Sequence, residues 1–217
     1  MSIAINKYID HTLLKPDATR DDIKKICDEA KKYNFASVCI NPCNISFCKK
    51  ELLNSNVKVC TVIGFPLGQM TVEAKIAEAK DAIAKGANEV DMVLNIAALK
   101  QNNLEYVTNE IKLIADVCHK NKVLLKVIIE TCLLNQEQKI NACQCVSNAK
   151  ADFIKTSTGF SISGATVDDV ILLRKYCSPD VKVKASGGIG SYKDAIDMIN
   201  AGAERIGTSK GVMLIKG

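Results

Sequence analysis

Two lysines and an aspartate stand in apolar runs that predict β-strands. Lys155 ends the stretch "FIK", Lys184 lies in "VKVKASG" and Asp91 lies in "EVDMVLN". Charged groups are costly to bury and lysine is depleted in strands, so these positions need a chemical reason. A deprotonated amine can attack a carbonyl carbon, and a carboxylate can carry protons for the same reaction. The three residues therefore indicate covalent catalysis through a lysine imine.

The nucleophile must be a lysine that has lost its proton. Free lysine has a pKa of about 10.4 and is almost fully protonated at pH 7. Burial and a neighbouring cation both disfavour the charged form. If Lys184 lies beside Lys155, one of the two can become a neutral amine, and Asp91 can move protons directly or through water. Each residue alone is more typical of a solvated strand end or a structural hydrogen bond, but the three together favour catalysis.

Eight short β-rich runs, separated by helical patterns, extend along the chain of 217 residues. They cover residues 7–14, 35–40, 58–65, 89–95, 123–130, 152–158, 181–187 and 205–209. This alternation is typical of a parallel sheet, and eight units predict a (β/α)8 TIM barrel. A doubly wound open sheet is the alternative, but the first run lacks a following G-x-G-x-x-G. No linker divides the sequence, so we expect one domain over 1–217.

Helix boundaries and faces are also visible in the sequence. Helix starts with the pattern [ST]-x-x-[DE] occur at Thr19, Thr166 and Ser191, and helix-ending glycines at Gly86 and Gly202. The segment 71–85 places an apolar stripe on one helical face, consisting of Val72, Ile76, Ala79 and Ile83. This stripe is typical of an amphipathic helix.

Aligned repeats place the charged residues inside the barrel. The junctions "KGANEVD" and "AGAERIG" match each other and "AKADFIK", which puts Asp91, Lys155 and Gly207 in one register. If the residues before them face the helices, strand alternation turns Asp91 and Lys155 to the lumen. Alternate strands contribute to the same layer, and Lys184 lies near the carboxyl-end mouth, where barrel active sites occur.

A second group of charged residues shares the inward parity at greater depth. Lys182 lies two residues before Lys184, and Glu89 and Lys126 have similar parity on their own strands. We therefore expect a structural ion network of these three residues below the active site.

Three loops at the same end of the barrel are rich in small residues. They contain Gly159, the pair Gly187-Gly188, and Ser209-Lys210. Small residues let backbone N–H groups approach an anion, and Ser191 would start a helix that adds positive potential. Barrel enzymes often bind phosphate at the loops after strands seven and eight. Either glycine pattern alone often marks only a tight turn, but the combination predicts a phosphate site.

Composition excludes several other classes of function. The net charge of +5 is mild, and no Trp is present to stack on bases, so nucleic-acid binding is not expected. The ten cysteines contain no C-x-x-C, and with only His11 and His119 available, no metal site is expected. No run of about 18 apolar residues predicts a membrane span. The first twenty residues lack the apolar core of a signal peptide, which favours a reducing, cytoplasmic location.

The motifs together resemble the deoxyribose-phosphate aldolase family of class I, Schiff-base aldolases. The resemblance covers nearly the whole chain in order, through "IDHTLLKP", "SVCINP", "GFPLG", "EVDMVLN", "KVIIET", "DFIKTSTGF", "VKASGGI" and "RIGTS". It implies a (β/α)8 barrel and the reversible cleavage of 2-deoxy-D-ribose 5-phosphate, in deoxyribonucleoside breakdown, to D-glyceraldehyde 3-phosphate and acetaldehyde. It also implies that no metal or organic cofactor takes part.

The resemblance assigns roles to individual positions. It implies that Lys155 forms the Schiff base, that Lys184 perturbs it and that Asp91 joins a proton relay. Sugar contacts fall to Asp10, Thr12 and Cys39, with Thr158 in the loop that opens toward substrate. The phosphate would be held by Gly159, Gly187, Gly188 and Ser209.

The sequence departs from the family pattern at three places. Phe160 stands where some members have a lysine near the phosphate, and Lys210 stands where many have a small residue, so Lys210 is a candidate replacement charge. The sequence ends at Gly217 without the tyrosine-bearing tail of some longer members, so no side chain is assigned to protonate the enamine. The alternatives are another Schiff-base sugar-phosphate lyase or transaldolase, or a barrel that only binds sugar phosphates. Barrel helices can pair in several ways, which leaves a homodimer open.

Overall fold

Eight parallel strands close into a barrel at the centre of the molecule, a computed structural model that describes residues 4–216. The strands pair in chain order, and the first pairs with the last. They are β1 (Ile9–Leu13), β2 (Ser37–Ile40), β3 (Lys58–Ile63), β4 (Glu89–Val93), β5 (Leu124–Ile128), β6 (Phe153–Lys155), β7 (Lys182–Ser186) and β8 (Arg205–Thr208). The expected (β/α)8 barrel is confirmed, and each strand lies inside its predicted run. Gly217, where one departure from the family falls, lies outside the described residues.

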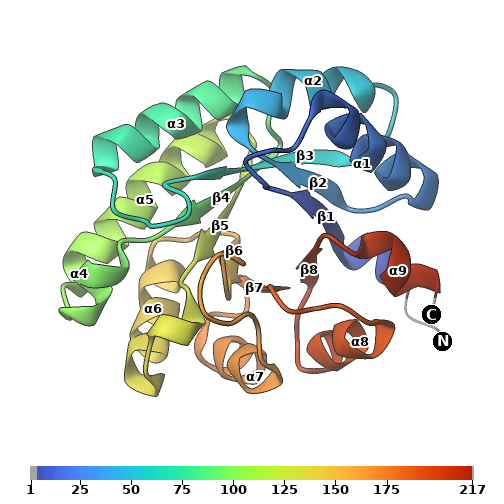
Figure 1. The fold of residues 1–217 in the computed structure, drawn as a ribbon. Coiled ribbons are helices and arrows are strands. Elements are labelled where there is room, and N and C mark those ends of the chain that lie inside the picture. Colours follow the sequence, from blue (N-terminus) through green and yellow to red (C-terminus); the bar gives the residue numbers. More distant parts are fainter. Residues whose placement is uncertain (1–3, 217) are drawn as a thin grey trace.

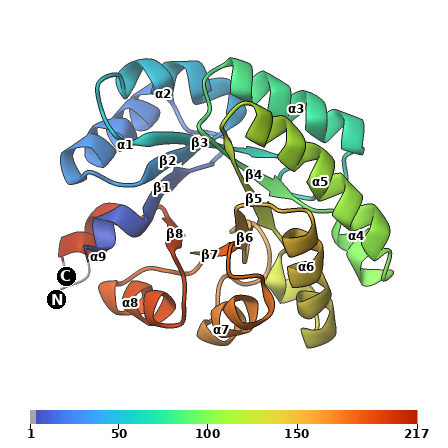
Figure 2. The ribbon, with the colours of Figure 1, turned by 180° about the vertical axis from the view of Figure 1, so that it is seen from behind.

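Helices surround the barrel on the outside (Figures 1 and 2). The α-helices are α1 (Arg20–Tyr33), α2 (Ile45–Glu51), α3 (Val72–Ala84), α4 (Ile96–Lys100), α5 (Leu104–Lys120), α6 (Gln136–Asn148), α7 (Val167–Tyr176), α8 (Tyr192–Asn200) and α9 (Gly211–Lys216). Short 3-10 helices are η1 (Ile5–Tyr8), η2 (Pro42–Asn44) and η3 (Thr131–Leu133). The first and last helices, η1 and α9, pack side by side.

The predicted helix boundaries are confirmed. Each of the predicted cap side chains, on Thr19, Thr166 and Ser191, accepts a backbone N–H from the third helical residue. Gly86 and Gly202 follow α3 and α8 with φ of 105° and 111°. Local sequence therefore determines where these helices begin and end.

Strand alternation divides the core into an apolar shell and a charged lumen. Outward residues such as Val90, Ile154 and Ile206 are fully buried against the helices. Burying such a side chain contributes about 1.5–3 kcal/mol, so this shell supplies much of the stability. Only a small apolar cluster lies apart from it, formed by Leu14, Cys39, Cys60 and Val62.

The lumen is filled in layers by side chains from alternate strands. Asp91 pairs with Lys126 and Lys126 with Phe153, so a stagger of about one residue per strand brings Lys155 level with Asp91. Applied to every strand, this places Ser37, Glu89, Phe153 and Arg205 in one layer, Asp10, Cys60, Lys126 and Lys184 in the next, and Cys39, Asp91, Lys155 and Gly207 in a third toward the carboxyl ends. The shared register of Asp91, Lys155 and Gly207 thus holds.

Helix α3 differs from its sequence-based description. Its stripe residues Val72, Ile76 and Ile83 are only half-buried, whereas Lys75 is fully buried together with Ala79 and Ala82. The Lys75 ammonium donates to the carbonyls of Gly68 and Val93 at 2.9 and 2.8 Å and to Glu110 at 2.6 Å. Because all three N–H groups are used, the lysine can be buried, and it ties the loop after β3 to β4 and α5.

We expect Lys75→Met to lower the free energy of unfolding by about 3–5 kcal/mol, because it leaves the Glu110 carboxylate buried without its cation. Urea unfolding measures the loss. The control is Lys24→Met, which removes a lysine paired on the surface with Asp28 and should cost about 0–1 kcal/mol. Equal, small losses in both variants would contradict a structural role for the buried pair.

Candidate active site

A cavity of about 470 Å³ opens at the carboxyl ends of the strands. The last residues of three adjacent strands line it, namely Lys155, Ser186 and Thr208. Eight of the candidate site residues lie on its wall: Thr12, Lys155, Thr158, Gly159, Gly187, Gly188, Ser209 and Lys210. The remaining four, Asp10, Cys39, Asp91 and Lys184, lie in the lumen and are fully buried.

Lys155 and Lys184 meet at one oxygen atom. The Nζ atoms of Lys155 and Lys184 each lie 2.8 Å from Oδ2 of Asp91. The two lysines are also direct partners in the pairing of β6 with β7. Lys155 is 3% exposed and Lys184 is 0% exposed, so only Lys155 faces the cavity. The three residues singled out by sequence are therefore in mutual contact.

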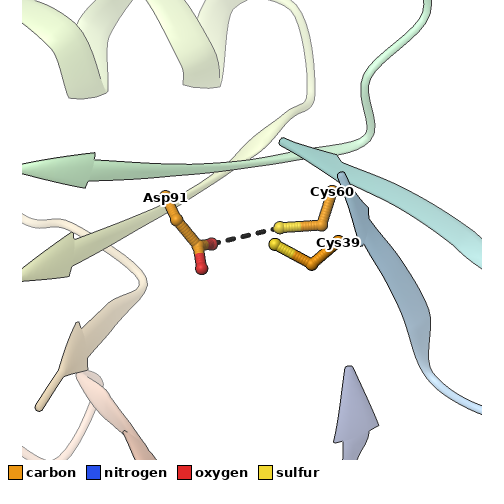
Figure 3. A group of neighbouring side chains, drawn as sticks. All are labelled: Cys39, Cys60 and Asp91. Atoms are coloured by element: carbon orange, nitrogen blue, oxygen red, sulfur yellow. Dashed lines mark hydrogen bonds between the residues drawn. The ribbon is translucent and has the colours of Figure 1, made fainter. Parts of the chain in front are cut away.

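The second oxygen of Asp91 is bound from deeper in the lumen. Oδ1 accepts from Lys126 Nζ at 2.8 Å and from the Cys60 thiol at 3.2 Å. Figure 3 shows Cys60 directed at Asp91, with Cys39 beside it on the neighbouring strand. Burial alone would raise the pKa of Asp91, but the ammonium groups of Lys126 and Lys184 hold it well below its usual range. Asp91 is thus an anion at any physiological pH.

Lys184 is held as a cation by two carboxylates. Its Nζ contacts Asp10 Oδ2 at 2.5 Å as well as Asp91, and Asp10 accepts a further bond from Ser37. Burial would lower the pKa of Lys184, but the two anions outweigh burial and raise it. An ammonium has three N–H groups, so one remains for another partner. Asp10 therefore positions Lys184 from beneath the cavity.

The expected ion network below the site is present in part. Glu89 and Lys126 are buried and form an ion pair of 2.5 Å, as predicted. Lys182 does not join them: its side chain is 54% exposed, and its carboxylate contact is with Glu204 at 3.9 Å. Its position at the start of β7 leaves the side chain at the open lower end, where the ammonium reaches water. The missing cation is Arg205, which bridges Asp10 and Glu89 at 2.7 and 2.8 Å.

Two clusters in the lumen have donor atoms close enough to hold a metal ion: Cys39, Cys60 and Asp91, and Asp10, Cys60 and Glu89. Lys126 Nζ already lies between them, 3.3 Å from Cys60 Sγ and within hydrogen-bonding distance of Asp91 and Glu89. A divalent ion would therefore have to displace an ammonium group and face further cations. Among the described residues, these donor atoms are already engaged in the ion network.

The loop after β6 is fixed on both sides. Towards β7, the Thr156 hydroxyl accepts from the Ser186 N–H at 3.1 Å, and the Ser186 hydroxyl donates to the Ser157 carbonyl at 2.6 Å. Towards β5, the buried carboxylate of Glu130 accepts from the N–H and hydroxyl of Thr158. Sequence reasoning missed Glu130; the only signal was an acidic residue ending an apolar run.

The glycine-rich loops after β6 and β7 form part of the cavity wall, and this wall carries positive charge. Gly159 and Gly188 have φ of 83° and 78°, and a Cβ at either would meet no atom within 4 Å, so glycine permits the turn and leaves the cavity open. The charged residues on the wall are all lysines: Lys15, Lys155 and Lys210. Lys15 was not identified from sequence, although it lies in "HTLLKP". An anion-binding end to the cavity follows from this lining.

Phe160 lies at the rim. It is 53% exposed and packs edge-to-face on Phe65, with ring centroids 5.3 Å apart. Phe65 comes from the loop after β3, which Lys75 holds from behind. Phe160 thus links the loop after β6 to the loop after β3 at the mouth of the cavity.

Comparison with known proteins agrees with this geometry. The model of the DeoC/LacD family aldolases matches residues 4–214. Proteins named deoxyribose-phosphate aldolase from Streptococcus sanguinis and Caldicellulosiruptor saccharolyticus are 56% and 57% identical, over 98% and 97% of this chain and 96% of each relative. The solved structure of a deoxyribose phosphate aldolase from Aeropyrum pernix is 35% identical, covers 98% of this chain and 89% of its own, and superposes with a TM-score of 0.90. By its family match, its relatives and its barrel, the chain belongs to the DeoC/LacD family of aldolases.

Proposed function

We propose that the protein cleaves 2-deoxy-D-ribose 5-phosphate reversibly to D-glyceraldehyde 3-phosphate and acetaldehyde, through a Schiff base on Lys155. The observation that carries the proposal is the contact of Lys155 and Lys184 with the same oxygen of Asp91, at the floor of a lysine-lined cavity. The names of the relatives support the same substrate. The reaction belongs to deoxyribonucleoside breakdown.

The charge of the lumen favours Lys155 as the neutral amine. The network contains three acids, Asp10, Glu89 and Asp91, and four bases, Lys126, Lys155, Lys184 and Arg205. With every group ionised, the cluster carries one positive charge too many. Anions raise the pKa of Lys126, Lys184 and Arg205, whereas Lys155 contacts one carboxylate and borders the cavity. Lys155 is therefore the base with the fewest carboxylate contacts and the one that reaches the substrate, as the proposed nucleophile must.

The reaction then follows from this arrangement. Neutral Lys155 attacks the C1 aldehyde of the open-chain sugar, and loss of water from the carbinolamine gives an iminium ion beside the Asp91 carboxylate. The C2–C3 bond breaks as the C3 hydroxyl loses its proton to a relay of Asp91, Lys184 and water. The bonding electrons move into the enamine, and glyceraldehyde 3-phosphate leaves. Protonation and hydrolysis of the enamine release acetaldehyde and free Lys155.

The substrate phosphate fits the glycine-rich side of the cavity. Gly159, Gly187, Gly188 and Ser209 supply backbone N–H groups, and Lys15 and Lys210 supply charge. We propose that Thr12 contacts the sugar from the wall. The Thr158 hydroxyl is already engaged by Glu130 and Phe160, so Thr158 would serve the substrate through the loop that it holds. Asp10 and Cys39, which lie below the wall, would act through Lys184 and Asp91 rather than by direct contact.

The alternatives differ in what they would leave unexplained. Another Schiff-base lyase or a transaldolase needs no second lysine in contact with the nucleophile's carboxylate, and a panel of sugar phosphates separates it from the proposed enzyme. A barrel that only binds sugar phosphates would have no need of a neutral amine. Absence of any retro-aldol turnover would favour that reading.

Several wider aspects remain proposals. The lysine imine is itself the electron sink, so we propose that the reaction needs no metal or organic cofactor. We also propose that residues 1–217 act as one domain in the cytoplasm, without nucleic-acid or membrane partners. No helix within residues 4–216 has the length and apolar character needed to cross a membrane. A homodimer through the outer helices stays a prediction; the Aeropyrum pernix enzyme is described as a tetramer.

Replacing Lys155 by Leu should abolish cleavage of deoxyribose 5-phosphate, because Lys155 is the one of the three lysines on Asp91 that reaches the cavity. Borohydride reduction in the presence of acetaldehyde, followed by peptide mass mapping, should find the adduct on Lys155 in the parent protein. Lys182→Leu, which removes an exposed lysine from the next strand, is the matched control and should retain activity. An adduct on any other residue would refute the assignment.

Lys184→Met should lower kcat by about 10²–10⁴-fold at pH 7, as expected for loss of an acid–base group. Removing one cation leaves three acids and three bases, so Lys155 would be retained as a protonated counter-ion. Imine trapping should therefore recover in this variant as the pH rises from about 7 to 9.5, toward the usual lysine pKa. A trapping rate that stays equally low across this range would show that Lys184 does not control the protonation of Lys155.

Lys210→Ala should raise KM for the phosphorylated substrate by about tenfold, since a hydrogen bond to a charged group is worth about 1.5 kcal/mol or more. Steady-state kinetics with deoxyribose 5-phosphate measure the change. Lys193→Ala, which removes an exposed lysine of α8 outside the cavity, should leave KM as it was. An unchanged KM in Lys210→Ala would remove Lys210 from the phosphate site.

A further inference from the structure

Glu130 is a buried carboxylate behind the active-site loop that the reaction scheme does not use. It is 2% exposed and does not line the cavity. Within residues 4–216, no Lys, Arg or His contacts it as an ion-pair partner. A buried carboxylate without a cation needs hydrogen bonds to compensate for lost hydration. Those hydrogen bonds come mainly from the loop after β6, and the Cys132 thiol adds a contact of 4.0 Å to Oε1.

The backbone at Glu130 is also unusual. Its φ and ψ are 56° and 66°, in the left-handed region that residues with a Cβ rarely adopt. Among the described residues, the other non-glycine positions with positive φ are Asn34, Asn54, Asn102, Lys122 and Lys150, and none of them is buried. Such a conformation persists where the surroundings compensate for it, often at a functional site. The carboxylate contacts supply that compensation.

The carboxylate of Glu130 determines the path of the loop after β6 through one residue, Thr158. It accepts from the Thr158 backbone N–H at 3.2 Å and from the Thr158 hydroxyl. Because the hydroxyl proton is used in this way, its oxygen is free to accept the Phe160 N–H at 3.0 Å. The turn from Thr158 to Phe160 is thus built on the carboxylate.

Gly159 lies between these two fixed residues and lines the cavity. Within the described part of the chain, its own N–H has no protein acceptor. Thr158 and Phe160 direct their N–H groups to Glu130 and to the Thr158 hydroxyl, so within the turn 158–160 Gly159 is the residue with an N–H left for a ligand oxygen. A phosphate oxygen is the acceptor that suits an N–H beside a lysine-rich wall.

We propose that Glu130 is a positioning residue for phosphate recognition: through Thr158, it holds the turn that presents the Gly159 N–H to the substrate phosphate. The inference rests on the proposed function and adds a residue that touches neither the sugar nor Lys155. It predicts that Glu130 matters for substrates with a phosphate and not for those without one.

The test compares deoxyribose 5-phosphate with unphosphorylated 2-deoxyribose. Glu130→Gln removes the negative charge and replaces one acceptor oxygen by an NH2 group, which weakens the hold on Thr158. KM for the phosphorylated sugar should therefore rise about tenfold while kcat changes little. KM for 2-deoxyribose and the rate of borohydride trapping with acetaldehyde should stay at parent values. Glu137→Gln, which neutralises an exposed acid in the first turn of α6, is the matched control for charge.

A second variant separates positioning from folding. Glu130→Gly removes the carboxylate and supplies the residue that tolerates a left-handed backbone best. It should show the same rise in KM for the phosphorylated sugar, with thermal unfolding close to that of the parent. Equal changes in KM for both substrates, or no change for either, would overturn the role of Glu130 but not the proposed function. If the parent protein cleaves neither sugar, the proposed function fails and this inference fails with it.

Discussion

The structure depends on one buried carboxylate that is shared by three lysine side chains. Asp91 lies at the centre of the lumen, with Lys155 and Lys184 on one oxygen and Lys126 on the other. A buried anion or a buried lysine alone would cost several kcal/mol, so each group is tolerable only because the others are present. The barrel must therefore hold these side chains in register, and the apolar shell outside the strands supplies the stability that makes this possible.

Barrel stagger is the geometric device that assembles the cluster. Residues from alternate strands meet in layers inside the lumen. Asp91 on β4 and Lys155 on β6 therefore reach each other although β5 lies between their strands. Room is provided at the same level by Gly207, where a Cβ would approach Lys184 Cε to 3.2 Å and Ser186 Cβ to 2.9 Å. A side chain at this position would push Lys184 away from Asp10 and Asp91. The absence of a side chain at Gly207 thus leaves the space that Lys184 occupies.

Sequence predicted what depends on local periodicity and missed what depends on depth or on long-range contacts. The eight strands, the caps and the facing of Asp91 and Lys155 follow from alternation and repeat spacing. Lys182 has the same parity as Lys184, but parity gives the face of a strand and not the distance from the open end, so its exposure was not predictable. The burial of Lys75 needs carbonyls from the loop after β3 and from β4, and Glu130 needs a left-handed backbone that no local sequence pattern predicts. Arg205 could have been found, because it stands two residues before Gly207 in the repeat frame.

The excess positive charge of the lumen acts at two stages of the proposed reaction. Before substrate binds, three carboxylates already face three other cations, so the neutral Lys155 that the proposed attack requires leaves the cluster without net charge. Once the imine forms and is protonated, the same excess returns on the iminium nitrogen, close to Lys184. Cleavage of the C2–C3 bond converts that iminium into a neutral enamine and so relieves the repulsion again. An arrangement that only stabilised the iminium would slow cleavage of the C2–C3 bond. A surplus of one positive charge instead favours the neutral species at both stages, the amine before the attack and the enamine after the cleavage. The fully buried cations beneath the site therefore contribute to the chemistry by their number as well as by their positions.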